Sequence, residues 1–300
     1  MNISVIIPVY RNSDLFLKNL KNNIKFLSNC EIIVVNDYTK ESLKDKLKDY
    51  QDIILIENKE NKGFGSTINI GVSKAKHKYI MLLNSDVILT NEDYKNAIHY
   101  FEKNTDLFAV SFAQKEKDGS IVGKNTIYWQ KGMMNHEKAN NISFGDNAWA
   151  EGGSCIIDKY KFNKLNGFDS IYSPFYWEDI DLSYQALKAG YKILFDPSIQ
   201  VIHYHESTIG KYFDKKYIKT IALRNQLIFI WGNIFDTNLI FQHTFFLSYY
   251  FIYFLIKLDF SFLNAFFQAI FKLNIICKKR KEQKNTIKLT DKDILQKFNN

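Results

Sequence analysis

The 300-residue chain contains few prolines and few cysteines. Three Pro argue against a disordered or linker-rich chain, because such segments are usually enriched in proline. Cys30, Cys155 and Cys277 lie far apart and form no C-x-x-C pair, so they indicate neither a zinc site nor a disulfide framework. A reducing compartment is therefore the expected context.

The N-terminus lacks the features of a signal peptide. MNISVIIPVYRN has no basic first segment and no long apolar core. We expect it to form the first strand of the fold.

An excess of positive charge is also missing from most of the chain. Residues 1–271 carry 31 Lys and Arg against 29 Asp and Glu, whereas residues 272–300 carry nine against three. A nucleic-acid-binding protein would place its basic residues along a groove of the fold itself. The charge distribution therefore argues against a nucleic-acid partner and leaves the basic C-terminal segment to be explained separately.

The first hundred residues alternate between strand and helix patterns. Short apolar runs predict buried strands, and apolar residues at helical spacing predict helices between them. The predicted strands are 3–9, 31–35, 53–57 and 79–83, and the predicted helices are 14–27, 42–50, 66–76 and 91–103. This order predicts an α/β fold with a mainly parallel, Rossmann-like sheet covered by flanking helices. After a less regular region, residues 193–195 and 200–204 predict a further pair of strands.

Two acids follow predicted strands at the point where each strand ends. Ligands of parallel α/β sheets bind beyond the carboxyl ends of the strands. Asp86 is therefore a candidate ligand of Mg²⁺ or Mn²⁺ that bridges a diphosphate. Asp37 is a candidate acceptor of hydrogen bonds from a base or ribose. An ordinary turn or capping role is open for both.

The stretch NKGFGSTINIG follows a strand and opens a helix, as a dinucleotide-binding motif does. Gly63 and Gly65 are present, but Ile68 stands where the third glycine belongs. This disfavours a nicotinamide-dependent oxidoreductase. The glycines still permit close approach of a ligand, and Asn61 and Asn69 are candidates to orient it.

Two adjacent carboxylates, Glu178 and Asp179, follow a run of aromatic residues and open a predicted helix. Acids at a helix start can simply cap free N–H groups. That accounts for one acid, but not for a pair against an aromatic wall. Phe175 and Trp177 are core residues by default, or alternatively form a stacking platform for a sugar ring.

His203 and His205 flank Tyr204 in a strand-like run, so alternation places both on one face. One of them can complete a metal shell with Asp86, since imidazole joins oxygen ligands on Mn²⁺. A pair of hydrogen-bonded surface histidines is the alternative.

Taken together, these motifs resemble family-2 glycosyltransferases of the GT-A type. The similarity extends from residue 3 to about 208 and includes SVIIPVYRN, IIVVNDYT, NKGFGSTINIG, YIMLLNSDV, AEGGSCIIDKYKFNKLNGFD, FYWEDIDLSYQALKAGYKI and VIHYHEST. RNQLIFIWGN, at 224–233, extends it. The branch that looks most similar contains bacterial rhamnosyltransferase-like enzymes that build surface polysaccharides.

The resemblance implies a role for each matching residue. Asp179 would be the catalytic base, and Glu178 would help to position it. Asp86 would ligate Mg²⁺ or Mn²⁺, and His205 would meet the metal or the diphosphate. The residues implied in nucleotide-sugar binding are Pro8, Tyr10, Asp37, Asn61, Gly63, Asn69, Asn84, Glu151, Gly152, Gly153 and Trp177. The usual D-x-D of the family is Asn84-Ser85-Asp86 here, which implies looser metal dependence.

The implied activity is that of an inverting glycosyltransferase. It would move a sugar from dTDP-rhamnose or a UDP-sugar to a glycan or lipid-linked saccharide in cell-surface polysaccharide assembly. A general base that takes the proton of the attacking hydroxyl typically contributes about 10²–10⁴-fold in rate. The alternative is a non-catalytic sugar-nucleotide-binding or scaffold protein, against which the retained acids argue. Donor, acceptor, linkage and oligomeric state, including a homo-oligomer, stay open.

The C-terminal segment predicts a helical appendage, 236–300, after a catalytic domain at 1–235 with a nucleotide-binding half (1–105) and an acceptor half (106–235). Residues 237–256 contain no Asp, Glu, Lys or Arg and are long enough to span a membrane, although polar residues dilute their first half. Apolar residues at 263–271 follow helical spacing, and the basic run KKRKEQK comes next.

These features predict a peripheral anchor on the cytoplasmic face of the cell membrane, because apolar surface beside clustered Lys and Arg suits anionic lipid. Packing of the same helices on the catalytic domain or on a second subunit is the alternative.

Overall fold

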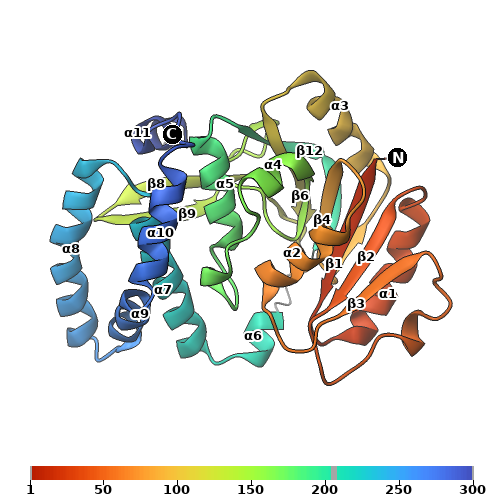
Figure 1. Ribbon diagram of the computed structural model, residues 1–300, viewed down its shortest axis with the longest axis horizontal. Helices are drawn as coiled ribbons and strands as arrows, with labels where there is room; N and C mark the ends of the chain where they lie inside the picture. Colours follow the sequence, from red (N-terminus) through yellow and green to blue (C-terminus); the bar gives the residue numbers. More distant parts are fainter. Residues whose placement is uncertain (1, 204–207, 299–300) are drawn as a thin grey trace.

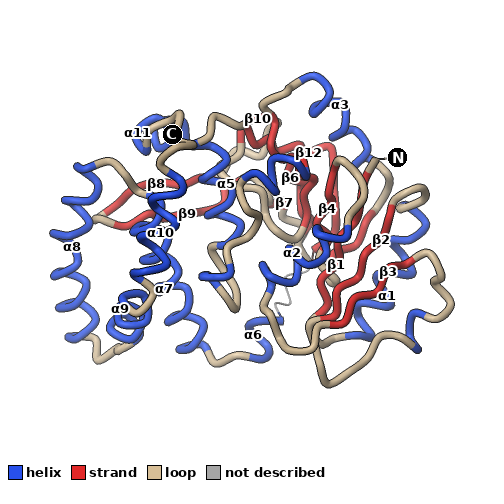
Figure 2. Tube along the Cα trace, viewed as in Figure 1, coloured by secondary structure: helices blue, strands red, loops and turns tan. Residues whose placement is uncertain are grey.

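The computed structural model describes residues 2–203 and 208–298, and in it one large sheet lies beside a group of C-terminal helices (Figures 1 and 2). The strands are β1 (Ile3–Val9), β2 (Glu31–Asn36), β3 (Ile53–Glu57), β4 (Tyr79–Leu83), β5 (Val87–Leu89), β6 (Leu107–Lys115), β7 (Ile121–Val122), β8 (Asn125–Gln130), β9 (Met133–Lys138), β10 (Gly145–Asp146), β11 (Ser154–Asp158) and β12 (Lys192–His203).

The α-helices are α1 (Ser13–Asn23), α2 (Phe64–Lys74), α3 (Asn96–Lys103), α4 (Lys159–Lys164), α5 (Glu178–Lys188), α6 (Thr208–Tyr212), α7 (Lys215–Asn233), α8 (Thr237–Ile256), α9 (Ser261–Ile270), α10 (Leu273–Gln283) and α11 (Asp291–Phe298). Short 3-10 helices are η1 (Ile24–Phe26), η2 (Asp45–Leu47), η3 (Asp93–Lys95) and η4 (Ser170–Tyr172).

The large sheet has the strand order β10-β12-β6-β11-β4-β1-β2-β3. β1 pairs in parallel with β2 and β4, β2 pairs in parallel with β3, and β12 pairs in parallel with β6. β11 runs antiparallel between β4 and β6. The predicted α/β sheet with flanking helices is confirmed, but the sheet is mixed. β11 is a reversed strand near its centre, and β5, β7 and β10 also pair antiparallel with their neighbours.

Both faces of the sheet are buried, which explains the continuous apolar runs. Alternate residues of β1 enter two different hydrophobic clusters. Ile6 packs with Ile68 of α2 on one face, whereas Val5 packs with Phe16 of α1 and Phe101 of α3 on the other. The strands therefore end at a common edge with helices on either side.

Two local predictions are wrong. Residues 42–50 form no α-helix beyond the short turn η2, because the Glu57 carboxylate accepts the backbone N–H of Leu43 and competes with helical hydrogen bonds. The predicted strand pair at 193–195 and 200–204 is one strand, β12, up to His203. Its register shifts between Asp196 and Gln200, around Pro197, which has no N–H for the ladder.

The helices α9, α10 and α11 pack on α7, α5 and β8, with α8 at the outer edge of the group (Figure 1). Phe262, Ile276 and Ile294 of these helices belong to the same hydrophobic cluster as Trp177 at the start of α5. The boundary predicted at residue 235 stays a prediction, but the segments on its two sides share one core.

Two buried ion pairs connect the C-terminal helices to α5. Lys279 Nζ lies 2.7 Å from Asp181 Oδ2, and Lys188 Nζ lies 2.7 Å from Asp291 Oδ1. Arg280 donates to the carbonyl of Ile234 at 2.5 Å. The expectation that the basic run faces lipid is therefore wrong for Lys279 and Arg280, because their partners are carboxylate and carbonyl oxygens of the protein.

Candidate active site

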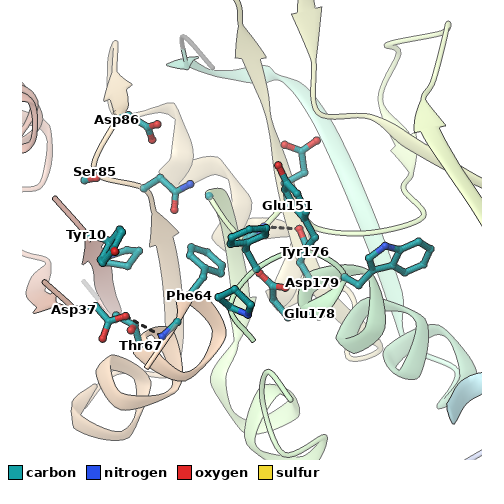
Figure 3. Close-up of a pocket in the computed structure, with 18 of the residues that line it drawn as sticks. Tyr10, Asp37, Phe64, Thr67, Ser85, Asp86, Glu151, Tyr176, Glu178 and Asp179 are labelled. Atoms are coloured by element: carbon teal, nitrogen blue, oxygen red, sulfur yellow. Dashed lines mark hydrogen bonds between the residues drawn. The ribbon is translucent and has the colours of Figure 1, made fainter. Parts of the chain in front are cut away.

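A cavity of about 570 Å³ opens beyond the carboxyl ends of β1, β2 and β4. The predicted site residues that line it are Pro8, Tyr10, Asp37, Asn61, Gly63, Asn84, Asp86, Glu151, Gly152, Gly153, Trp177, Glu178 and Asp179. Figure 3 shows Tyr10, Asp37 and Asp86 on one side, and Glu151 and Asp179 on the other. The topology therefore brings together side chains that are far apart in sequence.

Two predicted residues are not among those that line the cavity. Asn69 donates from Nδ2 to the carbonyl of Phe168 at 2.7 Å and accepts from its N–H at 3.0 Å. These two bonds join the loop after α4 to α2, and the role of Asn69 in donor binding stays a prediction. His205 lies outside the described residues.

At the strand-end side, the Asp37 carboxylate organises the loop before α2. It accepts hydrogen bonds from Asn58 Nδ2 at 2.8 Å, Lys62 N at 2.8 Å and Gly63 N at 2.9 Å. Gly63 has φ of +77°, and a Cβ there would lie 2.7 Å from Ser173 Oγ. Glycine at this position lets the backbone pass close to the opposite wall of the cavity.

Asp86 lies beside a histidine of the neighbouring strand. β5 pairs with β12 so that Val87 is opposite His203, and Asp86 Oδ1 lies 3.2 Å from His203 Nε2. His203 Nδ1 lies 2.6 Å from Gln114 Oε1, and Gln114 Nε2 donates to Glu151 Oε2. The structure thus brings His203 next to the predicted metal ligand.

The geometry of Asp86 and His203 fits a divalent cation. Bond lengths of about 2.0–2.1 Å in an octahedral shell place neighbouring ligand atoms about 2.9 Å apart. The observed 3.2 Å separation is close to that value. The described residues contain no cluster of three or more His, Cys, Asp and Glu that could hold a metal, so water or phosphate oxygens would complete the shell.

Asn84, at the first acid position of D-x-D, is packed against Gly153. A Cβ on Gly153 would lie 2.6 Å from Asn84 Nδ2, and a Cβ on Gly152 would lie 2.8 Å from the Phe64 ring. Among the described residues, the buried Asn84 Oδ1 has no hydrogen-bond partner. It is therefore a neutral oxygen available to a ligand on the Asp86 side of the cavity.

On the opposite wall, α5 begins at Glu178 after two residues with left-handed backbone. Tyr176 has φ of +71° and Trp177 has φ of +77°, which is uncommon for bulky side chains. Asn225 Nδ2 donates to the carbonyls of Phe175 and Tyr176, both at 2.9 Å. These bonds from α7 hold the strained turn that delivers the acid pair to the cavity.

The two adjacent carboxyls occupy different environments. Asp179 accepts hydrogen bonds from Gly152 N at 3.2 Å and Ile180 N at 2.8 Å, whereas Glu178 Oε2 has no partner among the described residues. Burial raises the pKa of Asp179 to about 6, although the Gly152 N–H opposes the rise. Burial and the neighbouring Asp179 charge raise the pKa of Glu178 to about 8. At neutral pH, Asp179 is therefore mainly ionised and Glu178 mainly protonated.

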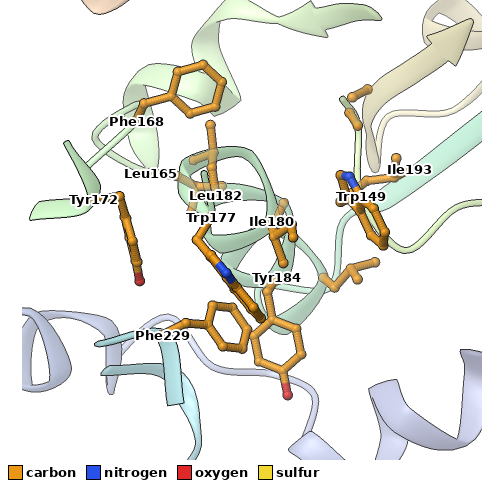
Figure 4. Packing of buried hydrophobic residues seen from close by; sticks show 14 of the residues in the cluster. Trp149, Leu165, Phe168, Tyr172, Trp177, Ile180, Leu182, Tyr184, Ile193 and Phe229 are labelled. Carbon is orange, nitrogen blue, oxygen red and sulfur yellow. The ribbon is translucent and has the colours of Figure 1, made fainter. Parts of the chain in front are cut away.

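The aromatic wall is mostly hydrophobic core. Phe175 and Trp177 are buried, and Trp177 packs against Phe229 with ring centroids 5.0 Å apart (Figure 4). The exposed ring that lines the cavity is Tyr176. Phe175 and Trp177 are thus part of the core and also line the cavity, so their role as a stacking platform for a sugar ring stays a prediction.

Residues 4–165 match the sequence model of Glycosyl transferase family 2. The chain belongs to this family. It is similar to the rhamnosyltransferase WbbL of Escherichia coli (strain K12), with 24% identity over 234 residues that cover 72% of this chain and 88% of WbbL. It is also similar to the poly-beta-1,6-N-acetyl-D-glucosamine synthase of Staphylococcus aureus (strain MSSA476). That likeness has 24% identity over 200 residues, covering 65% of this chain and about half, 48%, of the synthase.

The glycosyltransferase also has the fold of solved members of this enzyme class. GalNAc-T7 with UDP, GalNAc and Mn²⁺ matches with a TM-score of 0.62 at 18% identity, covering 79% of this chain and 48% of that one. S. aureus TarS 1-349 with UDP-GlcNAc matches with a TM-score of 0.57 at 16% identity, covering 88% and 79%. The mannosyltransferase PcManGT from Pyrobaculum calidifontis, with GDP-Man and Mn²⁺, matches with a TM-score of 0.54 at 12% identity, covering 91% and 75%. These similarities confirm the predicted GT-A-type fold.

Sequence reasoning missed several residues that line or support the cavity of this glycosyltransferase. His136 of β9 lies between the rings of Trp149 and Trp177, with centroids 5.3 and 5.2 Å away. Burial lowers the pKa of its imidazole, so it is neutral at pH 7. Gln114 connects His203 to Glu151. Neither has a local motif, because each acquires its neighbours only through strand pairing.

Proposed function

We propose that this family-2 enzyme is an inverting glycosyltransferase with Asp179 as its general base. It transfers a sugar from a nucleotide-diphosphate sugar to a glycan or lipid-linked saccharide in cell-surface polysaccharide assembly. The supporting observation is the cavity itself, which has Asp37 and Asp86 at the strand ends and an ionised Asp179 on the opposite wall. dTDP-rhamnose and UDP-sugars are the donor candidates, since one relative is a rhamnosyltransferase and TarS was solved with UDP-GlcNAc.

In this proposal, the strand-end side binds the donor. Pro8, Tyr10 and Asp37 hold the nucleoside, and Asn61 and Gly63 shape the donor pocket. Asp86 and His203 hold Mg²⁺ or Mn²⁺, and the two neighbours solved with Mn²⁺ support a divalent ion. When bound, such a cation offsets the negative charge of the departing diphosphate.

The opposite wall supplies the proton acceptor. The acceptor hydroxyl oxygen forms a bond to the anomeric carbon as the bond from that carbon to the diphosphate oxygen breaks. The hydroxyl proton passes to Asp179. The Gly152 N–H, 3.2 Å from Asp179 Oδ2, orients this carboxylate beside the sugar subsite formed by Glu151, Gly152 and Gly153.

The test is release of nucleoside diphosphate from a panel of UDP-, dTDP- and GDP-sugars, with Mg²⁺ or Mn²⁺ and with saccharide and glycolipid acceptors. We expect Asp179→Asn to reduce transfer at least about 10²-fold, the lower end of the contribution of a general base. Donor binding by calorimetry should stay unchanged. The control is Asp14→Asn, since the Asp14 side chain is 98% exposed. Full activity of Asp179→Asn contradicts the assigned base, and donor binding without turnover by the wild-type chain favours the scaffold alternative.

We further propose that the enzyme lies peripherally on the cytoplasmic face of the cell membrane. α8 is long and apolar enough to cross a membrane, and only 6% of its apolar window is buried. Its inner side is held by protein, because His243 accepts from Trp231 Nε1 at 2.9 Å and contacts the Gly132 carbonyl at 2.6 Å. A helix fixed along one side and apolar along the other suits an interfacial position better than a spanning one.

Vesicle co-sedimentation tests this position. Phe241 and Phe245 are 72% and 66% exposed on α8, so the double substitution Phe241→Asp/Phe245→Asp should weaken binding to anionic vesicles. Tyr160→Asp is the matched control, because Tyr160 is an exposed aromatic residue on α4. If the double variant instead separates a wild-type dimer, the face is an interface between two copies of the chain.

A further inference from the structure

A hydrogen-bond chain crosses from the sugar side of the cavity to the candidate cation ligands. It passes from Glu151 through Gln114 to His203, and His203 faces Asp86. Gln114 lies on β6 with 1% of its surface exposed, opposite Val201 of β12. A buried amide between two functional side chains must satisfy both of its ends, which restricts its orientation.

The Glu151 carboxylate fixes that orientation. An ionised carboxylate only accepts hydrogen bonds, and Glu151 accepts from Gln114 Nε2 and from Asn125 Nδ2, the latter at 3.1 Å. The amino group of Gln114 therefore points to Glu151, and its carbonyl oxygen points to His203. A carbonyl oxygen also only accepts, so His203 Nδ1, at 2.6 Å, is the donor and carries a proton.

We propose that Gln114 is a positioning residue that holds His203 in the Nδ1–H tautomer, so that Nε2 and Asp86 Oδ1 together bind the divalent cation. This rests on the cation of the proposed function. A neutral Nδ1–H imidazole has its lone pair on Nε2, the atom 3.2 Å from Asp86 Oδ1. Two such acceptors side by side are stabilised by one cation bound to both.

The arrangement couples the sugar subsite to the cation site. Among the described residues, the hydrogen bonds that connect Glu151 to His203 pass through the Gln114 amide. A substitution of Glu151 therefore alters cation affinity through the orientation of Gln114. The same substitution should have no effect on cation affinity once Gln114 has been replaced. This dependence separates a positioning role from two independent structural contributions.

The experiment measures Mn²⁺ affinity of the full chain by electron paramagnetic resonance of free Mn²⁺, without nucleotide sugar. Gln114→Met should weaken binding about 10–100-fold, the usual loss for a residue that orients a metal-ligating histidine. Glu151→Gln should weaken Mn²⁺ binding less than Gln114→Met does. In the Gln114→Met background, Glu151→Gln should cause no further loss of Mn²⁺ affinity. Gln200→Met is the control, since Gln200 is an exposed glutamine on β12. Unchanged affinity of Gln114→Met, equal effects of Glu151→Gln in both backgrounds, or no Mn²⁺ binding by the wild type would overturn the proposal.

A second readout needs no cation. In the ¹⁵N spectrum of the metal-free chain, His203 Nδ1 should be protonated, and Glu151→Gln should allow the Nε2–H tautomer to form as well while residue 114 is intact. A single Nε2–H tautomer in the wild type refutes the inference even if Gln114→Met does not fold. Diphosphate release that is insensitive to metal chelation would refute the cation site while leaving the transferase standing.

Discussion

Replacing Lys279 by Met tests how far the C-terminal helices belong to the catalytic unit. Lys279 Nζ lies 2.7 Å from Asp181 Oδ2 and 2.9 Å from Asp169 Oδ2, and Asp181 is fully buried. Removing one partner of a buried pair leaves an uncompensated charge and destabilises a protein by about 3–5 kcal/mol. Asp181 keeps hydrogen bonds from Tyr172 Oη at 2.8 Å and Asn233 Nδ2 at 2.7 Å. We therefore expect Lys279→Met to lower the free energy of unfolding by about 3 kcal/mol, the lower end of this range.

Urea unfolding at neutral pH measures this loss. With an m value of about 3 kcal/mol/M for a chain of this size, the midpoint should fall by about 1 M. The control is Lys278→Met on the same helix, because the Lys278 side chain is 79% exposed and its carboxylate partner is 4.0 Å away. Such a surface pair contributes only about 0–1 kcal/mol.

A companion variant checks the cause. Adding Asp181→Asn removes the buried charge and should recover part of the loss at pH 7. The ion-pair reasoning is refuted if Lys279→Met lowers the free energy of unfolding no more than Lys278→Met does. It is also refuted if adding Asp181→Asn to Lys279→Met lowers that free energy further.

Four further predictions concern the acid pair and Gly153. Because the base must be ionised and burial raises the pKa of Asp179 to about 6, kcat/KM should fall about tenfold per pH unit below that value; a flat profile down to about pH 4.5 contradicts the assignment. Glu178→Gln should retain transfer at pH 7, since this carboxyl is mainly protonated there; inactivity of a folded variant shows that its charge is needed. The raised pKa of Glu178, about 8 against 4.5 unfolded, means that stability falls between these values as pH rises; Glu178→Gln should remove that slope in urea unfolding at about pH 5 and about pH 9. Gly153→Ala places a Cβ 2.6 Å from Asn84 Nδ2, so donor affinity measured by calorimetry should drop about tenfold, whereas an unchanged affinity shows that Asn84 can move without loss.

The positions of β1, β2, β3 and β4 were predictable from short apolar runs, but the position and direction of β11 were not. A strand buried on both faces has the same continuous apolar pattern whether it runs parallel or antiparallel. Residues 154–158 pair with β4 on one side and β6 on the other, both antiparallel. That arrangement depends on the connections before and after the strand, which hydrophobic periodicity does not report.

The candidate site also contains some residues that the sequence predicted and others that it did not. Asp86 and Asp179 were found because each stands in a local motif, at a strand end and at a helix start. Gln114 and His136 were missed because their neighbours come from other strands. Gln114 meets His203 through the pairing of β6 with β12, and a shift of one residue would turn it to the other face.

The basic run near the C-terminus shows that the charge of a side chain in the sequence does not reveal which groups it contacts in the fold. Lys278 and Lys279 are adjacent, yet one is exposed and the other lies against two acids about a hundred residues earlier in the chain. A lysine beside an apolar helix has the same sequence context in both cases. Only the folded position of α10, which brings Lys279 to Asp181 of α5, distinguishes a contact with lipid from a buried ion pair.

This packing changes how membrane binding has to be tested. Truncation before α8 would remove Lys279 from Asp181 and Asp291 from Lys188, leaving both charges unpaired on α5, the helix that carries Asp179. Each such loss is worth about 3–5 kcal/mol, which together approach the whole stability of a typical domain. We therefore expect a chain ending at residue 236 to be unfolded, and its loss from vesicles would say nothing about α8. Substitutions on the exposed face of α8 leave both ion pairs intact, so a change in vesicle binding with unchanged urea unfolding isolates the contribution of that face. If the truncated chain instead folds and transfers sugar, the C-terminal helices are dispensable for the site, and the ion pairs stabilise α5 far less than their burial indicates.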